Sequence, residues 1–117
     1  MSIDPLPGAK PLAVRPSPTW GEIAPAGQTA AVMRFVLIDR VVTYPAGEFR
    51  RWEHVLGVLE TLTLATAKEL IVIEGWELTE IRAALDLGRL CELRVNFPLK
   101  SGARPGAQVR RITIEPA

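Results

Sequence analysis

Proline dominates the first quarter of the chain. Six of the ten prolines stand at positions 5, 7, 11, 16, 18 and 25, where each removes a backbone hydrogen-bond donor and disfavours helical geometry at the residue before it. Residues 1 to 27 are therefore predicted to form an extended arm, neither a regular helix nor a central strand. Residues 28 to 117 are predicted to form a single globular domain, because 117 residues are too few for two full domains and 48% of them are apolar.

The arm also carries apolar side chains that a plain solvated linker would lack. We expect these side chains to be covered, either by the arm's own domain or by a neighbouring chain, and the sequence leaves both possibilities open. The arm residues predicted to bind a partner are Leu6, Leu12, Val14, Trp20 and Ile23.

β-branched and aromatic residues crowd the segment from residue 30 to residue 44 and predict one long strand. Its apolar centre, residues 35 to 38, is expected to be buried on both faces. Pro45 to Gly47 then provide a turn signal. Residues 50 to 59 combine helical spacing with strand-like alternation, so that a short helix and a bent strand both remain open.

Residues 60 to 65 and 70 to 73 predict two strands of a hairpin that turns at Thr66 to Lys68. A helix is predicted at residues 77 to 87, and Gly88 stands where helices commonly end in left-handed geometry. The apolar face of this helix consists of Leu78, Ile81, Ala84 and Leu85.

Alternating apolar residues predict two last strands, at residues 90 to 97 and 108 to 115. The inward face of the first of these strands is expected to hold Cys91, Leu93, Val95 and Phe97. Taken together, the elements predict an α+β fold with a predominantly antiparallel sheet of about five strands, one principal helix and the extended Pro-rich N-terminal arm.

The net charge of +1 hides an asymmetry along the chain. Residues 53 to 92 contain eight acidic and three basic residues, whereas residues 93 to 117 contain one acidic and five basic residues. If the last strand lies near the first, arginines from two segments form one positive surface that attracts phosphate or an acidic partner. The residues of this predicted anion-binding surface are Arg50, Arg51, Arg110 and Arg111.

Few residues of the chain suit catalysis or metal binding. His54 is the only histidine, so no second imidazole can share a metal with it. Cys91 is the only cysteine, which excludes an internal disulfide and favours a reducing, cytoplasmic compartment. The glycines do not form a phosphate-binding motif, and no apolar run is long enough to span a bilayer. We therefore expect no cofactor, no metal and no membrane association.

These features favour a non-catalytic protein-protein interaction or structural assembly subunit, which docks on other chains or on copies of itself through the arm and strand edges. One alternative is a nucleic-acid or anionic-ligand binding module that uses the four arginines, with Trp52 as a stacking surface. A second alternative is a small hydrolase or dehydratase centred on His54.

Overall fold

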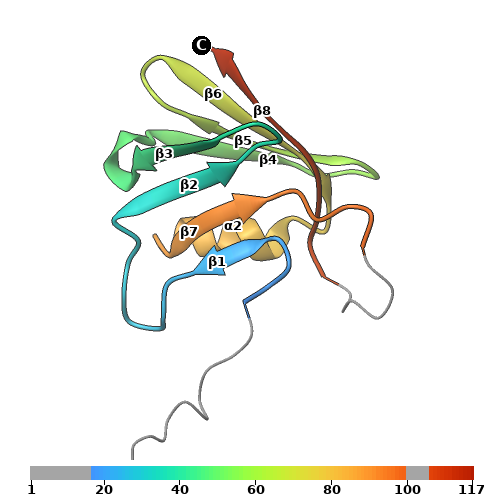
Figure 1. Cartoon of the computed structure of the whole chain (residues 1–117), viewed down its shortest axis with the longest axis horizontal. Helices are drawn as coiled ribbons and strands as arrows, with labels where there is room; N and C mark the ends of the chain where they lie inside the picture. Colours follow the sequence, from blue (N-terminus) through green and yellow to red (C-terminus); the bar gives the residue numbers. More distant parts are fainter. Residues whose placement is uncertain (1–16, 100–105) are drawn as a thin grey trace, which may run out of the picture.

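The computed structural model describes residues 17–99 and 106–117 (Figure 1). The predicted partner-binding residues Leu6, Leu12 and Val14 lie outside the described residues. The described part of the chain folds into two four-stranded sheets and one α-helix. The expected α+β class and the dominance of antiparallel pairing are confirmed, whereas the expectation of about five strands is wrong, since there are eight.

The first sheet has the strand order β1 (Gly21–Ile23), β7 (Leu90–Arg94), β2 (Val32–Val36) and β3 (Val41–Pro45). Neighbouring strands are antiparallel except β2 and β7, which run parallel. A parallel pair needs a long crossover connection. Here the connection contains most of the second sheet and the helix, so both sheets are tied together through one chain path (Figure 1).

The second sheet is antiparallel throughout, in the order β4 (Arg51–Val55), β5 (Glu60–Ala65), β6 (Glu69–Trp76) and β8 (Gln108–Pro116). The predicted hairpin through Thr66 is confirmed as β5 and β6. Its turn is held by the Thr66 hydroxyl, which accepts hydrogen bonds from two backbone N–H groups further along the turn.

The expected long strand over residues 30 to 44 is wrong, because β2 and β3 form a hairpin within it. The backbone N–H of Leu37 donates to the carbonyl of Arg40 at 2.8 Å and closes the turn. Ile38 was expected to be buried, yet it is 105% exposed at the tip. Asp39 is the turn residue that ends the strand, since aspartate readily adopts turn geometry even inside an aliphatic run.

Residues 51–55 are a strand, which resolves the choice between helix and strand at this position.

Strand β7 ends at Arg94, earlier than expected. The N–H groups of Asn96 and Phe97 donate instead to the carbonyl of Val109, so the chain leaves the first sheet and crosses to β8. The side chains of Val95 and Phe97, predicted to point inward, are therefore exposed.

The predicted helix is confirmed as α2 (Thr79–Asp86), and Gly88 adopts the expected left-handed geometry with φ +68°. The helix begins two residues later than predicted because Glu77 has a φ of +56°, which helical geometry excludes. A 3₁₀ turn, η2 (Ala46–Glu48), separates β3 from β4. The predicted apolar face of α2, comprising Leu78, Ile81, Ala84 and Leu85, is buried in the core.

The core lies between the two sheets and the helix and includes Phe35, Leu62, Ile73 and Leu93, all fully buried. Trp20 is also part of it at 2% exposure. The predicted arm is thus partly inside the fold, because its described residues from Ser17 onward lead into strand β1 at the edge of the first sheet. The described helix is too short and too polar to cross a membrane.

Candidate functional site

Apolar side chains gather in solvent at one end of the two sheets. Among the described residues, nine large hydrophobic side chains are exposed, and eight of them belong to turns or strand ends at this place. The turn between β4 and β5 contributes the densest group, with Val58 91% exposed. We call this surface the apolar end, and it consists of Ile38, Val41, Val55, Leu56, Val58, Leu59, Val95 and Phe97.

Strand register shows that these residues share an end. In the first sheet, Val36 lies opposite Val41 on one side and Arg94 on the other, so the β2–β3 turn and the segment after β7 are neighbours. The rings of Phe97 and Trp76 lie 4.8 Å apart and join this end of the first sheet to the end of β6. In Figure 1 the β4–β5 turn lies at the right edge of the molecule, and the β2–β3 turn points toward the same side but lies nearer the middle of the view.

In the second sheet, the same end is defined by a row across all four strands. Val55 pairs with Thr61, Thr61 with Glu74, and Glu74 with Arg111. The turn between β4 and β5 therefore lies at the end of the sheet where β6 finishes and β8 begins. Sequence reasoning missed this surface. A usable signal was the uncharged stretch Val55-Leu56-Gly57-Val58-Leu59, where a hairpin turn normally carries polar residues.

The four predicted anion-binding arginines do not come together. Strand β8 pairs with β6, not near β2, so Arg110 and Arg111 lie at one edge of the second sheet. Arg51 on β4 and Arg50, directly before β4, lie at the other edge. Three strand spacings separate these edges, roughly 14 Å. Arg51 also sits at the opposite end of the sheet, because its row runs through Ala65 and Leu70 to Glu115.

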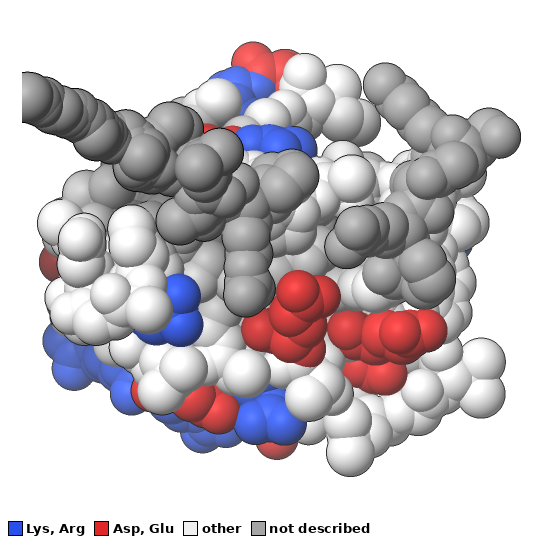
Figure 2. All heavy atoms as spheres, turned by 90° about the horizontal axis from the view of Figure 1, so that it is seen from below, with Lys and Arg blue, Asp and Glu red and all other residues white. Residues whose placement is uncertain are grey.

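At each edge, an acidic side chain neutralises part of the charge of the arginines. Arg51 pairs with Glu53 at 3.4 Å. Arg110 and Arg111 lie 3.8 and 3.7 Å from the same Glu74 carboxylate oxygen, too far for a hydrogen bond. Figure 2 shows acidic and basic side chains interspersed with neutral surface on the described part of the face seen from below. On this face the basic side chains gather mainly along the lower left edge, and the acidic side chains gather near the centre and right.

His54 is buried in a polar network between β4, β5 and α2. Its side chain is only 4% exposed. The Arg82 Nε–H donates to Nδ1 at 3.1 Å, so Nδ1 carries no proton and the ring proton resides on Nε2. Nε2 donates to the Glu60 carboxylate at 2.7 Å. Both ring nitrogens are therefore occupied within the chain, and neither is left to exchange a proton with a substrate.

Glu60 closes the start of helix α2. Besides the bond from His54, its carboxylate accepts hydrogen bonds from the backbone N–H groups of Leu78 at 3.0 Å and Glu77 at 3.3 Å. Burial raises the pKa of Glu60, but the bonds from His54 and from these two N–H groups lower it by more, so its pKa lies below the usual value. Glu60 thus serves as a cap supplied by another strand.

The network continues along α2 to its end. Trp52 donates from its indole N–H to Asp86 at 2.8 Å, and Arg82 donates to the other oxygen of the same carboxylate at 3.0 Å. The bond from Trp52, followed by that from Arg82, lowers the pKa of Asp86. Trp52 is therefore engaged within the chain, not held free for stacking on a base.

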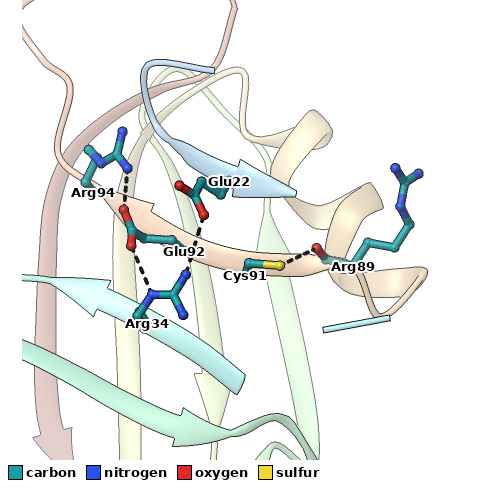
Figure 3. Close-up of polar contacts among 6 residues, drawn as sticks. All are labelled: Glu22, Arg34, Arg89, Cys91, Glu92 and Arg94. Atoms are coloured by element: carbon teal, nitrogen blue, oxygen red, sulfur yellow. Dashed lines mark hydrogen bonds and ion pairs between the residues drawn. The ribbon is translucent and has the colours of Figure 1, made fainter. Parts of the chain in front are cut away.

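A second charged cluster crosses the first sheet (Figure 3). Arg34 on β2 donates to Glu92 on β7 at 3.0 Å and lies 3.5 Å from Glu22 on β1, while Arg94 binds the second oxygen of Glu92. Hydrogen bonds from Arg94, and then from Arg34, lower the pKa of Glu92, and the Glu92 bond raises that of Arg34. These alternating charges hold three strands in register, and no charge is left over to attract a ligand.

The described arm residues pack on their own domain. Trp20 is buried, its indole N–H donates to Glu80 of α2 at 3.3 Å, and its carbonyl accepts from the N–H of Arg94. Ile23 is partly buried against the core and lies opposite Leu90. Trp20 is therefore covered by its own domain, and Ile23 is partly covered by it.

Cys91, the only cysteine, and Trp76 both contact other parts of the chain. Cys91 is a free, partly buried thiol 3.6 Å from the carbonyl of Arg89 (Figure 3). Trp76 packs against Phe97 at the end of β6, where it supports the apolar end. Among the described residues, no three histidine, cysteine, aspartate or glutamate side chains gather as a metal site would require. No protein family, characterised protein or solved structure shows significant similarity to the chain.

Proposed function

We propose that the protein is a non-catalytic protein-protein interaction or structural assembly subunit. It docks on other protein chains or on copies of itself through its N-terminal arm, its strand edges and the apolar end. The observation that carries the proposal is the apolar end, where eight large hydrophobic side chains stand in solvent on turns and strand ends at the same end of the two sheets. Monomeric proteins rarely expose a large continuous apolar patch unless it binds something.

The size of this surface fits a stable interface. A fully exposed aliphatic or aromatic residue offers roughly 150 to 200 Å², so the exposed fractions at the apolar end amount to on the order of 800 Å². A stable interface of standard size buries about 800 Å² on each partner. The exposed area of the apolar end is therefore of the size that a stable interface needs, and strand edges supply the main-chain hydrogen bonds that set its register.

The two alternative functions have weaker support. Nucleic-acid binding needs a coherent basic surface, whereas the arginines of β4 and β8 lie at opposite edges and have acidic neighbours. A hydrolase or dehydratase needs a histidine nitrogen that reaches substrate, whereas His54 is buried with both nitrogens bonded. A cytoplasmic location stays part of the proposal because the chain has one cysteine, and that thiol is free.

Sedimentation of the full chain over micromolar to near-millimolar concentrations tests the proposal. We expect reversible association of the native protein, weakened at least about tenfold by Leu56→Ser with Val58→Ser, because two apolar side chains leave the interface. Leu87→Ser is the matched control, since Leu87 is 63% exposed but lies at the end of α2, away from the apolar end. A chain that stays monomeric throughout contradicts the proposal.

The contribution of the arm is tested separately, in the full chain. Replacing Leu6, Leu12 and Val14 together by serine changes arm residues only, since all three precede the first described residue and no residue of the described core is altered. We expect this triple variant to associate more weakly than the native protein. Unchanged association would remove the arm from the proposal and leave the apolar end and the strand edges.

A further inference from the structure

Each sheet has two outer strands, and these differ in how freely their backbone can pair with another strand. Strand β1 has only three residues, and β3 ends in Pro45, which cannot donate a hydrogen bond. Strand β8 is partly occupied, because the Val109 carbonyl already accepts two N–H groups from the segment after β7. For Arg51–Val55 of β4, the described structure shows no backbone hydrogen bonds other than those of the ladder with β5. Strand β4 is therefore the most available edge.

The exposed face of β4 carries charges of opposite sign two residues apart. Arg51 and Glu53 are 70% and 62% exposed and pair with each other at 3.4 Å. Val55, the next residue on that face, begins the turn of the apolar end. The opposite face holds Trp52 and His54, which are engaged with α2. This edge thus combines free main-chain groups, a pair of opposite charges and an adjoining apolar surface.

We propose that β4 pairs antiparallel with β4 of a second copy, about a two-fold axis that passes beside Trp52, to form one continuous eight-stranded sheet. This inference rests on the proposed function and names its partner. With the axis at Trp52, Arg51 lies directly opposite Glu53 of the second copy, and Glu53 lies opposite the second Arg51. Opposite charges at directly opposed positions stabilise an antiparallel pair, whereas like charges destabilise it.

The two-fold arrangement also accounts for the position of the apolar turn. Because the strands run in opposite directions, the end of β4 extends past the start of the second β4, which follows η2. Val55 and the turn after it therefore lie against the second copy, which covers their apolar side chains. A two-fold contact of this kind uses the same patch on both copies and closes at two chains.

Charge reversal tests this arrangement in the full chain. Glu53→Arg places arginine opposite arginine twice, so we expect dimerisation to weaken about tenfold or more in sedimentation equilibrium. The double variant Arg51→Glu with Glu53→Arg exchanges the two charges and restores the opposed pairs, so we expect it to regain dimerisation. Rescue by the second substitution separates pairing from misfolding, and circular dichroism checks the fold of each variant.

Glu115→Arg is the matched control, because Glu115 is an exposed acid on β8, at the other edge of the same sheet. It should leave the dimer intact. The inference is overturned if Glu53→Arg has no effect, if the double variant stays monomeric, or if Glu115→Arg is the variant that breaks the dimer. If Glu53→Arg leaves association unchanged but Leu56→Ser with Val58→Ser abolishes it, only this inference is overturned. If the native chain never associates, the proposed function is overturned as well.

Binding of the native protein to phosphatidylcholine or phosphatidylserine vesicles, without self-association, also overturns the inference. It would identify a lipid surface as the occupant of the apolar turns. Flotation of the protein with such vesicles, carried out beside the sedimentation measurement, separates this outcome from dimerisation.

Discussion

The polar side chains beside helix α2, which we call the helix side, and the hydrophobic side chains of the apolar end have opposite surroundings. On the helix side, buried polar groups are paired: His54 uses both ring nitrogens, and Glu60 accepts three hydrogen bonds. At the apolar end, Ile38 and Val58 stand almost fully in solvent. The first region is satisfied by contacts within one chain, whereas the second, in the function we propose, is covered by a partner. Folding and association should therefore respond to different substitutions.

The largest loss of stability is expected on the helix side, at Trp20. Its indole is buried between β1 and α2 and bonds to Glu80. Trp20→Ala should lower the free energy of unfolding by about 3 to 5 kcal/mol, because it leaves a large cavity and removes a strand-to-helix contact. Chemical denaturation followed by circular dichroism measures this change. A loss below about 1 kcal/mol would mean that Trp20 is not part of the core.

Glu60 should give the next largest effect. Glu60→Gln removes the charge that caps α2 and binds His54, at a cost of about 1 to 3 kcal/mol near neutral pH. The folded pKa of Glu60 is lowered. The stability it contributes is therefore fully present above the unfolded value of about 4.3 and is lost as pH falls through the folded pKa.

Denaturation curves measured from neutral to acid pH test this dependence. The native protein and the Glu60→Gln variant should differ most near neutral pH and converge in acid. A constant difference at every pH would show that the charge of Glu60 is not what stabilises the helix start.

Tyr44 should give a smaller effect, away from both regions. Burial, followed by the hydrogen bond to Glu69 at 2.7 Å, raises its pKa to about 12. Tyr44→Phe should cost about 0.5 to 1.5 kcal/mol below pH 10, and the stabilisation should vanish as pH rises through the folded pKa. Since Tyr44 is the only tyrosine, ultraviolet absorbance of its phenolate reports this titration directly. An ordinary tyrosine pKa near 10 would refute the contact.

The smallest effect on stability is expected at the apolar end. Leu56→Ser with Val58→Ser should change the free energy of unfolding of the monomer by no more than about 0.5 kcal/mol per site, because both side chains are exposed. The same variant should lose association. Thermal unfolding at low protein concentration measures the first effect. A large loss of monomer stability would mean that the turn packs on its own domain.

Local patterns in the sequence were sufficient for α2 and for the β5–β6 hairpin. The helical face from Leu78 to Leu85 and the glycine at position 88 are signals contained within one element. The same reasoning failed at residues 30 to 44, because the apolar run concealed a turn at Asp39. Apolar content alone does not distinguish a buried strand centre from an exposed hairpin tip.

Local sequence patterns did not predict contacts between residues that lie far apart in the chain. Nothing near His54 in the sequence indicates that Arg82, 28 residues later, occupies its Nδ1. The four arginines lie apart for a related reason, since the predicted surface depended on β8 lying near β2, whereas β8 pairs with β6. Trp20 is a further example. The prolines around it predicted an extended arm, but they gave no sign that its indole enters the core.

Methyl NMR of the native full chain tests most directly whether the apolar end is a docking surface. We predict that the methyl signals of Ile38, Leu56 and Val58 shift and broaden as concentration rises, while those of Leu87 stay constant. Sharp signals at all four residues, with positions independent of concentration, would contradict the account.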